Sequence, residues 1–152
     1  MTATLPIQTT LATVVALLGG PSLMPQPIQT ELDLIRAAAA GVSVKAVRHL
    51  QRHMRLTNRE MSEMLSISES TLARREQSQQ PLSRDESEKA IQLSALAAHG
   101  LQVFENEPDF HRWLHTDNPA LGSIKPQTLL PSALGREQVR ELLGRIEWGI
   151  FS

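Results

Sequence analysis

The 152-residue chain contains no cysteine, which excludes disulfide frameworks and zinc sites built on thiolates. It also lacks a glycine-rich phosphate-binding loop and a Gly-x-Ser-x-Gly segment. No nucleophile, base and orienting residue can be grouped into a catalytic set. The acidic cluster at residues 85–88 is explained by the attraction of carboxylates to a helix N-terminus. The sequence therefore predicts a protein that is not an enzyme and carries no cofactor.

The chain also lacks a large excess of charge, since its formal net charge is −1. The charges are nevertheless unevenly distributed. Residues 36–75 contain eight basic and three acidic side chains, whereas residues 101–152 contain five basic and seven acidic ones. A cationic block followed by an anionic block predicts two surfaces for two kinds of partner.

Long hydrophobic runs are missing as well. The apolar run LATVVALL at residues 11–18 is too short to span a bilayer. The first basic residue is Arg36, so the positively charged start of a signal peptide is absent. We expect a cytoplasmic protein without a membrane partner, in which residues 11–18 form a helix or segment that docks on the rest of the chain.

Helical periodicity recurs along the chain, and no run alternates polar and apolar residues as strands do. Residues 19–29 hold two glycines and three prolines and are expected to form a linker. Helices are predicted over residues 31–40 and 43–55. A capping box at Ser83–Glu86 begins a longer helix, which Gly100 is expected to end. The predicted fold class is all-α.

Residues 57–76, TNREMSEMLSISESTLARRE, are the most informative stretch. They read as two short helices joined by a tight turn at residues 66–68, with basic side chains on the second helix. This pattern is typical of a helix-turn-helix, whose second helix enters the DNA major groove. The alternative is a packing motif with a solvated basic face. The side chains predicted to contact DNA lie at the start and along the outer face of the second helix: Ser68, Ser70, Thr71, Arg74 and Arg75.

Two histidine pairs have a spacing that can suit a metal. His49 and His53 are four residues apart, and so are His111 and His115. The segment HRWLH lacks the glutamate of the HExxH pattern, however, and no third ligand lies nearby in the sequence. We therefore expect surface or hydrogen-bonded histidines and no metal site.

The chain ends in an unusual concentration of large apolar residues. Trp148, Ile150 and Phe151 fall within the last five positions, where chains are commonly polar and frayed. These side chains either fold back onto the protein's own core or dock in a pocket of another protein.

Several short motifs then carry a family resemblance. They are the WL pair at residues 113–114, NPALG at 118–122, PQTLL at 126–130 and RIEWG at 145–149. In this order they resemble the toxin-binding domain of Xre/MbcA/ParS-type antitoxins. Upstream, SISESTLARRE followed by PLSRDES is similar to the same family's Xre-like helix-turn-helix, and the resemblance covers residues 41–152. Ser123 and Lys125 depart from the family pattern, which more often has glycine and a small or hydroxylated residue there.

The resemblance implies three parts. Residues 1–40 would form an N-terminal segment with an apolar helix and a linker. Residues 41–100 would form an Xre-like helix-turn-helix DNA-binding domain, and residues 101–152 a small helical toxin-binding domain. The implied function is that of a type II antitoxin, which keeps a cognate toxin inactive and represses its own operon. The partner toxin is commonly of the RES-domain type, which acts on NAD.

Two hypotheses follow from these parts. The C-terminal domain would cover the toxin's active-site mouth, through Glu141, Arg145, Glu147, Trp148, Ile150, Phe151 and Ser152. Operator binding would require a homodimer, because one recognition helix covers too few base pairs; residues 84–99 and 5–18 are the candidate interfaces. The alternatives are a stand-alone repressor whose C-terminal domain oligomerises or senses a ligand, and an adaptor whose helix-turn-helix has lost DNA contact.

Overall fold

Side-chain caps and turns divide the chain into short helices. The computed structural model describes residues 7–149. Within them it contains eight α-helices, three 3-10 segments and no β-strand, so the all-α prediction is confirmed. The helices are α1 (Ile7–Leu17), α2 (Glu31–Ala40), α3 (Val44–Met54), α4 (Asn58–Leu65), α5 (Glu69–Ser78), α6 (Arg84–Phe104), α7 (Glu107–Leu114) and α8 (Ala133–Glu147). The 3-10 segments are η1 (Pro21–Leu23), η2 (Pro119–Leu121) and η3 (Pro126–Leu129).

The predicted helix starts are confirmed by their caps. Capping boxes are formed by Thr57 with Glu60 and by Ser83 with Glu86. In each box the hydroxyl and the carboxylate accept hydrogen bonds from each other's backbone N–H groups, which would otherwise be left without partners. Thr30 also caps α2, and this helix ends at Gly41, whose φ of 100° is readily adopted by glycine.

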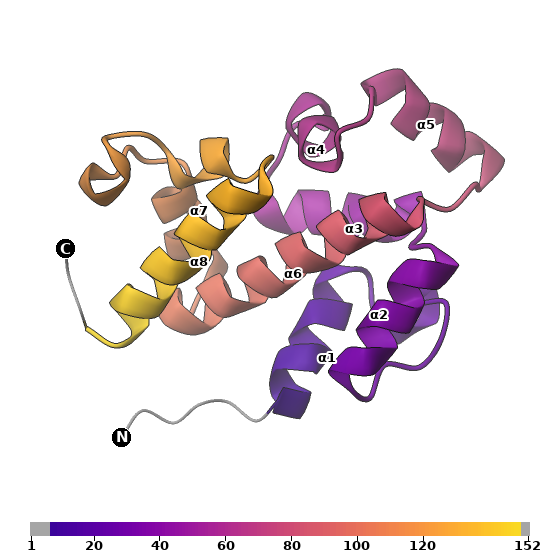
Figure 1. The fold of residues 1–152 in the computed structure, drawn as a ribbon, viewed down its shortest axis with the longest axis horizontal. Helices are drawn as coiled ribbons and strands as arrows, with labels where there is room; N and C mark the ends of the chain where they lie inside the picture. Colours follow the sequence, from indigo (N-terminus) through magenta and orange to yellow (C-terminus); the bar gives the residue numbers. More distant parts are fainter. Residues whose placement is uncertain (1–6, 150–152) are drawn as a thin grey trace.

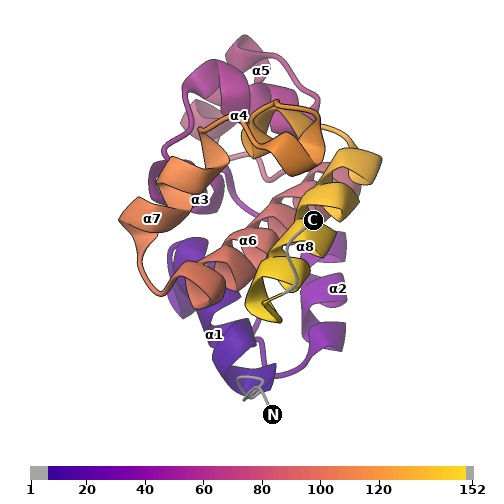
Figure 2. The ribbon, with the colours of Figure 1, turned by 90° about the vertical axis from the view of Figure 1, so that its left-hand side faces the viewer.

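α6 is the central helix of the fold. In Figure 1 it crosses the middle of the molecule, with α1 and α2 on one side and α7 and α8 on the other. α3 and α4 also contact α6, and Figure 2 shows α4 above it and α7 to its left. Its buried side chains include Ala90, Leu93, Ala97 and Ala98. Because they are mostly small, several helices can approach α6 closely around its circumference.

The apolar run at residues 11–18 forms most of α1 and docks on α6, as expected. Leu11, Val14 and Leu18 are buried. The hydroxyl of Ser94 in α6 donates a hydrogen bond to the carbonyl oxygen of Val14 at 2.8 Å. Its burial within the chain leaves little of this run available as a dimer interface. None of the helices between residues 7 and 149 combines the length and apolar character needed to cross a membrane.

The prediction that Gly100 ends α6 is wrong. The helix continues through Gly100 to Phe104. Gly100 is buried because the ring of Phe110 in α7 lies directly against it: a Cβ added at this position would be 2.1 Å from Cε1 of Phe110. The glycine therefore serves the close approach of α7 to α6, and this long-range contact cannot be read from local sequence.

The NPALG segment forms a turn closed by backbone hydrogen bonds. Asn118 accepts from the backbone N–H of Ala120 through its side chain at 2.9 Å, and its own N–H donates to the carbonyl of Ile124 at 3.0 Å. Ser123 adopts a φ of 64°. This is the left-handed conformation that glycine adopts without a steric penalty, which accounts for the glycine more common here in the family.

A glycine-to-alanine pair tests the packing of α7 on α6. Gly100→Ala is expected to lower the free energy of unfolding by about 1–3 kcal/mol, because the added methyl group overlaps the ring of Phe110. Gly144→Ala is the matched control, since a Cβ at Gly144 in α8 meets nothing within 4 Å. Gly144→Ala should raise the free energy of unfolding by about 0.5–1 kcal/mol. Urea denaturation measures both, and equal effects would contradict the contact.

Candidate functional site

The two predicted helices of the helix-turn-helix are α4 and α5, and α5 is the helix that the sequence predicts to contact DNA, the recognition helix of the motif. α4 ends at Ser66 with a φ of 60°, and Ile67 packs partly buried against the core. The hydroxyl of Ser68 accepts from the N–H of Thr71 at 3.1 Å and so caps α5. Leu72 is the buried side chain of α5. Figure 1 shows α5 projecting at one end of the molecule.

The outward face of α5 differs from the predicted set of residues. Ser70 and Arg74 are exposed, and Arg74 makes no ion pair with any residue of the described range 7–149. Gln77 is exposed one turn further along the same face. Sequence reasoning missed Gln77, although its i+7 spacing from Ser70 was the available signal. The hydroxyls of Ser68 and Thr71 hydrogen-bond to each other at 2.8 Å at the start of the helix.

Arg75 does not face outward as expected. It forms an ion pair with Glu86 at the start of α6, and the side chains of Arg75 and Glu86 are only 17% and 12% exposed. On the other side of α5, Glu76 pairs with Arg48 of α3 at 3.1 Å. Two neighbouring charged residues therefore attach α5 to two different helices. Arg75 joins α5 to α6, while Arg74 is exposed to solvent.

The ionised form of Glu86 is favoured by its surroundings. Burial by itself raises the pKa of a carboxyl group, but hydrogen bonds from the backbone of Ser83, from Arg75 and from the hydroxyl of Ser83 outweigh it, so the pKa of Glu86 is lowered. The same carboxylate thus completes the capping box of α6 and pairs with the recognition helix. It joins α5 to the central helix.

Polar contacts also join the helix-turn-helix to the C-terminal third. Gln127 of η3 donates to the carboxylate of Glu60 in α4. His53 in α3 hydrogen-bonds through Nδ1 to Glu107 in α7 at 2.7 Å, and Nε2 of His111 donates to the carbonyl of His53.

Within residues 7–149 no group of three potential ligands is placed to hold a metal. His53 and His111 are hydrogen-bonded, as one of the sequence alternatives held.

The outer face of α8 carries most of the describable residues predicted to bind a partner. Trp148 is 61% exposed, and Glu141 and Arg145 are also exposed. Leu134, at the other end of the same face, is 83% exposed and was not predicted. The sequence pattern that could have indicated Leu134 is its position outside the stripe of apolar residues that α8 buries. Ile150, Phe151 and Ser152 lie outside the described residues.

Glu147 differs from its neighbours because it turns inward. Its carboxylate lies 3.3 Å from Nε2 of His99 in α6, and both side chains are about three-quarters buried. Glu147 therefore helps to hold the end of α8 against α6, and it is poorly placed to reach another protein.

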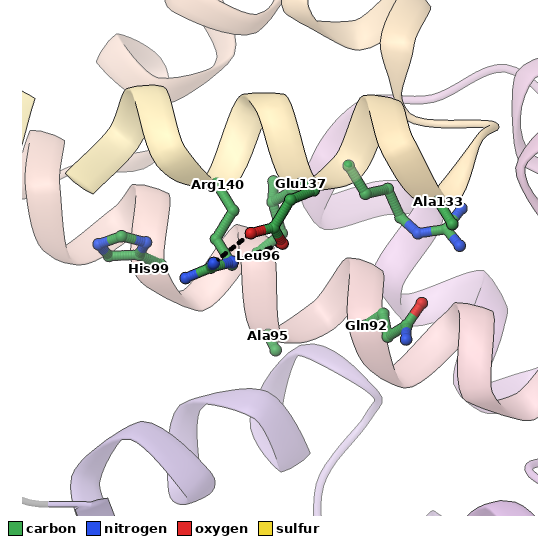
Figure 3. Close-up of a pocket in the computed structure, with 8 residues that line it drawn as sticks. Gln92, Ala95, Leu96, His99, Ala133, Glu137 and Arg140 are labelled. Atoms are coloured by element: carbon green, nitrogen blue, oxygen red, sulfur yellow. Dashed lines mark hydrogen bonds and ion pairs between the residues drawn. The ribbon is translucent and has the colours of Figure 1, made fainter. Parts of the chain in front are cut away.

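A groove of about 360 Å³ separates α6 from α8. Figure 3 shows Gln92, Leu96 and His99 of α6 facing Glu137 and Arg140 of α8 across it. Arg136 also lines the groove. Burial lowers the pKa of Arg136, and Asp85 partly opposes this effect.

Two family models match the chain. The antitoxin Xre-like helix-turn-helix domain matches residues 33–94. The antitoxin Xre/MbcA/ParS C-terminal toxin-binding domain matches residues 99–149. The first range contains α5 with its ion pairs to α3 and α6, and the second contains the whole of α8.

A characterised relative and a solved structure are also similar. A Prs ADP-ribosylating antitoxin of Sphingobium sp. (strain YBL2) is 24% identical over 130 residues, which cover 80% of this chain and 82% of that protein. The crystal structure of the M. tuberculosis MbcT-MbcA toxin-antitoxin complex contains a chain of similar fold. Its TM-score is 0.53 at 18% identity, over 82% of this chain and 100% of that chain. This likeness concerns the fold.

Acid unfolding tests the attachment of α5 through Glu86. The pKa of Glu86 lies below the ordinary value of 4.5. Its contribution to the free energy of unfolding is therefore complete above pH 4.5 and is lost as the pH falls through the lowered folded-state pKa. Glu86→Gln should lower the free energy of unfolding by about 1–3 kcal/mol near neutral pH, and by progressively less in acid.

The matched control for this measurement is Glu63→Gln, which breaks the exposed Arg59–Glu63 pair on α4. Its effect should stay below about 0.5 kcal/mol at every pH. A difference between Glu86→Gln and wild type that does not shrink in acid would show that the charge of Glu86 is not what stabilises this contact.

Proposed function

The chain belongs to the Xre/MbcA/ParS-type antitoxins, and on this premise we propose that it neutralises its toxin through the outer face of α8 and represses its own operon through α5. The toxin-binding surface is defined here by Leu134, Glu141, Arg145 and Trp148. The recognition surface is defined by Ser70, Arg74 and Gln77. In Figure 1, α5 lies at one end of the molecule and the C-terminal end of α8 at the other, so one chain can hold both partners.

The observation that carries the toxin-binding proposal is the pair of exposed apolar side chains of Leu134 in α8 and Trp148 directly after α8. Leu134 is 83% and Trp148 61% exposed, and a folded chain gains nothing from leaving such groups in water. Burying each of them fully in a partner contributes roughly 1.5–3 kcal/mol. Tryptophan is also enriched among the residues that dominate interface energetics. The 14-residue separation corresponds to about 21 Å along the helix, which suits a protein surface better than a small ligand.

The charged residues between Leu134 and Trp148 favour binding at the active site of a toxin. Glu141 can pair with cationic groups that a toxin uses to hold a phosphate-bearing substrate, and Arg145 adds a second charge of opposite sign. The toxin that we propose is of the RES-domain type and acts on NAD. The name of the Sphingobium relative, a Prs ADP-ribosylating antitoxin, supports a toxin of NAD chemistry. Ile150, Phe151 and Ser152 are also proposed to contact the toxin.

Operon repression is supported by the outward face of α5. Arg74 can pair with a phosphate or with guanine, and Gln77 can hydrogen-bond to adenine. One recognition helix covers too few base pairs for specific operator binding, so two are needed. We therefore propose that the repressing species is a homodimer. Leu32 and Ile35 of α2 are exposed apolar side chains that are available for self-association.

Substitutions on α8 test toxin neutralisation. Leu134→Ala and Trp148→Ala should each weaken binding of the toxin encoded beside this gene by about tenfold or more. The control is Leu32→Ala, which removes a leucine of α2 that is 51% exposed, against 83% for Leu134, and should leave toxin affinity unchanged. Binding is measured by calorimetry on the purified proteins.

Truncation gives an independent test in cells. Removing residues 148–152 leaves the Glu147–His99 contact in place, so α8 should remain folded while growth protection is lost. Full protection by the truncated chain would show that Trp148 and the following residues play no part in neutralisation.

Substitutions on α5 test repression separately. Arg74→Ala should weaken binding to the operon's promoter and reduce the slope of log affinity against log salt by roughly one if Arg74 contacts a phosphate. Arg112→Ala is the control, because Arg112 is an exposed arginine of α7. Gel shifts at several salt concentrations measure both. Loss of toxin neutralisation by Arg74→Ala would contradict the separation of the two surfaces.

A further inference from the structure

Arg136 differs from the other charged residues of this protein in its burial. Among the lysines, arginines, aspartates and glutamates of residues 7–149 it is the only buried one, at 8% exposed. Its Nη1 donates to the carbonyls of Leu130 at 3.0 Å and Pro131 at 3.4 Å. No carboxylate in that range forms an ion pair with it. Asp85 acts on it only over a longer distance and is itself paired with Lys89.

A buried cation without an anion is costly. Taking a guanidinium out of water loses solvation that two carbonyl dipoles replace only in part. The chain therefore carries a largely buried guanidinium that two backbone carbonyls contact and that no carboxylate of residues 7–149 pairs with. Buried charges in proteins are generally paired, so the missing partner is expected to come from another molecule.

The opening beside Arg136 can admit such a partner. Arg136 lines the groove of about 360 Å³ between α6 and α8. The other charged residues that line this groove are Arg140 and Glu137, which carry opposite charges, and Nε of Arg140 bonds to Glu137 at 3.0 Å. The groove thus lacks one negative charge. That number suits a single carboxylate and not a polyphosphate.

The shape of the lining indicates where the carboxylate comes from. Ala95 and Leu96 of α6 and Ala133 of α8 give the groove apolar walls, which suit the aliphatic stem of an aspartate or glutamate side chain. The groove also adjoins the toxin-binding surface, since Ala133 lines the groove and the next residue, Leu134, is exposed on the outer face of α8. A partner covering that face can reach the groove with one side chain.

We propose that the α6–α8 groove binds one aspartate or glutamate side chain of the toxin through Arg136. The inference rests on the proposed toxin-binding function and adds a specific subsite to it. The carboxylate completes the hydrogen bonding of the guanidinium and neutralises its charge. Binding of the toxin thereby removes the cost that the free antitoxin carries at this position.

Three full-length variants test the subsite in calorimetric titrations with the toxin encoded beside this gene. Arg136→Gln should weaken binding by about 30-fold or more, because the toxin carboxylate is then buried without a cation. Arg136→Lys should restore most of the affinity, since it keeps the charge. Arg112→Gln removes an exposed arginine of the same C-terminal region and should change the affinity less than about threefold.

A fourth variant does not alter the buried residue. Glu137 neutralises Arg140 at the edge of the groove and is exposed, so Glu137→Gln should fold normally and make the groove more positive. It is expected to tighten toxin binding by about two- to fivefold. Circular dichroism melting of each variant confirms that it is folded, and Glu137→Gln decides the question if Arg136→Gln does not fold.

The possible outcomes separate this inference from the proposed function. If the wild-type chain does not bind the toxin, the proposed function is overturned and the subsite with it. If the wild type binds and folded Arg136→Gln binds equally well, only the subsite is overturned. Loss of self-association in Arg136→Gln with unchanged toxin affinity would assign the groove to a second copy. Saturable binding of acetate by the wild type but not by Arg136→Gln, again with unchanged toxin affinity, would assign it to a small anion. Either result overturns the proposal.

Discussion

Several helices pack against one central helix, α6. They can approach it closely because many of its buried side chains are small. Ala90 and Ala97 are buried along its length, and Gly100 allows the ring of Phe110 to lie directly on the backbone. Close packing of this kind tolerates few changes in volume, since neighbouring helices cannot move independently. The positions of the other helices therefore depend on the side chains of α6.

Both proposed binding surfaces are attached to this helix. At its N-terminal end, Glu86 holds α5 through Arg75. At its C-terminal end, His99 contacts Glu147 at the end of α8. A recognition helix and a toxin-binding helix are thus supported by one helix of 21 residues, while their outward residues remain free to meet different partners. The proposed function thus gives a chain with a net charge near zero one surface for a polyanion and another for a protein.

Charged residues in this protein have two separable roles. Arg75, Glu86 and Glu147 are partly buried and join helices of the same chain. Arg74 and Glu141 are exposed and lie on the proposed binding surfaces. Arg136 belongs to neither group, because it is buried without a carboxylate partner in the chain. Charged residues of the same type are therefore partly buried and paired, exposed, or buried without an ion pair, depending on their surroundings.

Local features of this protein were predictable from its sequence. Capping boxes, the turn at residues 66–68 and the buried stripe of each helix depend on residues three or four positions apart, so their physical cause lies within one turn of helix. The family motifs likewise indicated the antitoxin domains. The inward turn of Arg75 and Glu147, the role of Gly100 and the isolation of Arg136 were decided by the tertiary structure. Each of these depends on contacts, or on missing partners, across helices that are distant in the sequence, and no local pattern specifies which helices meet.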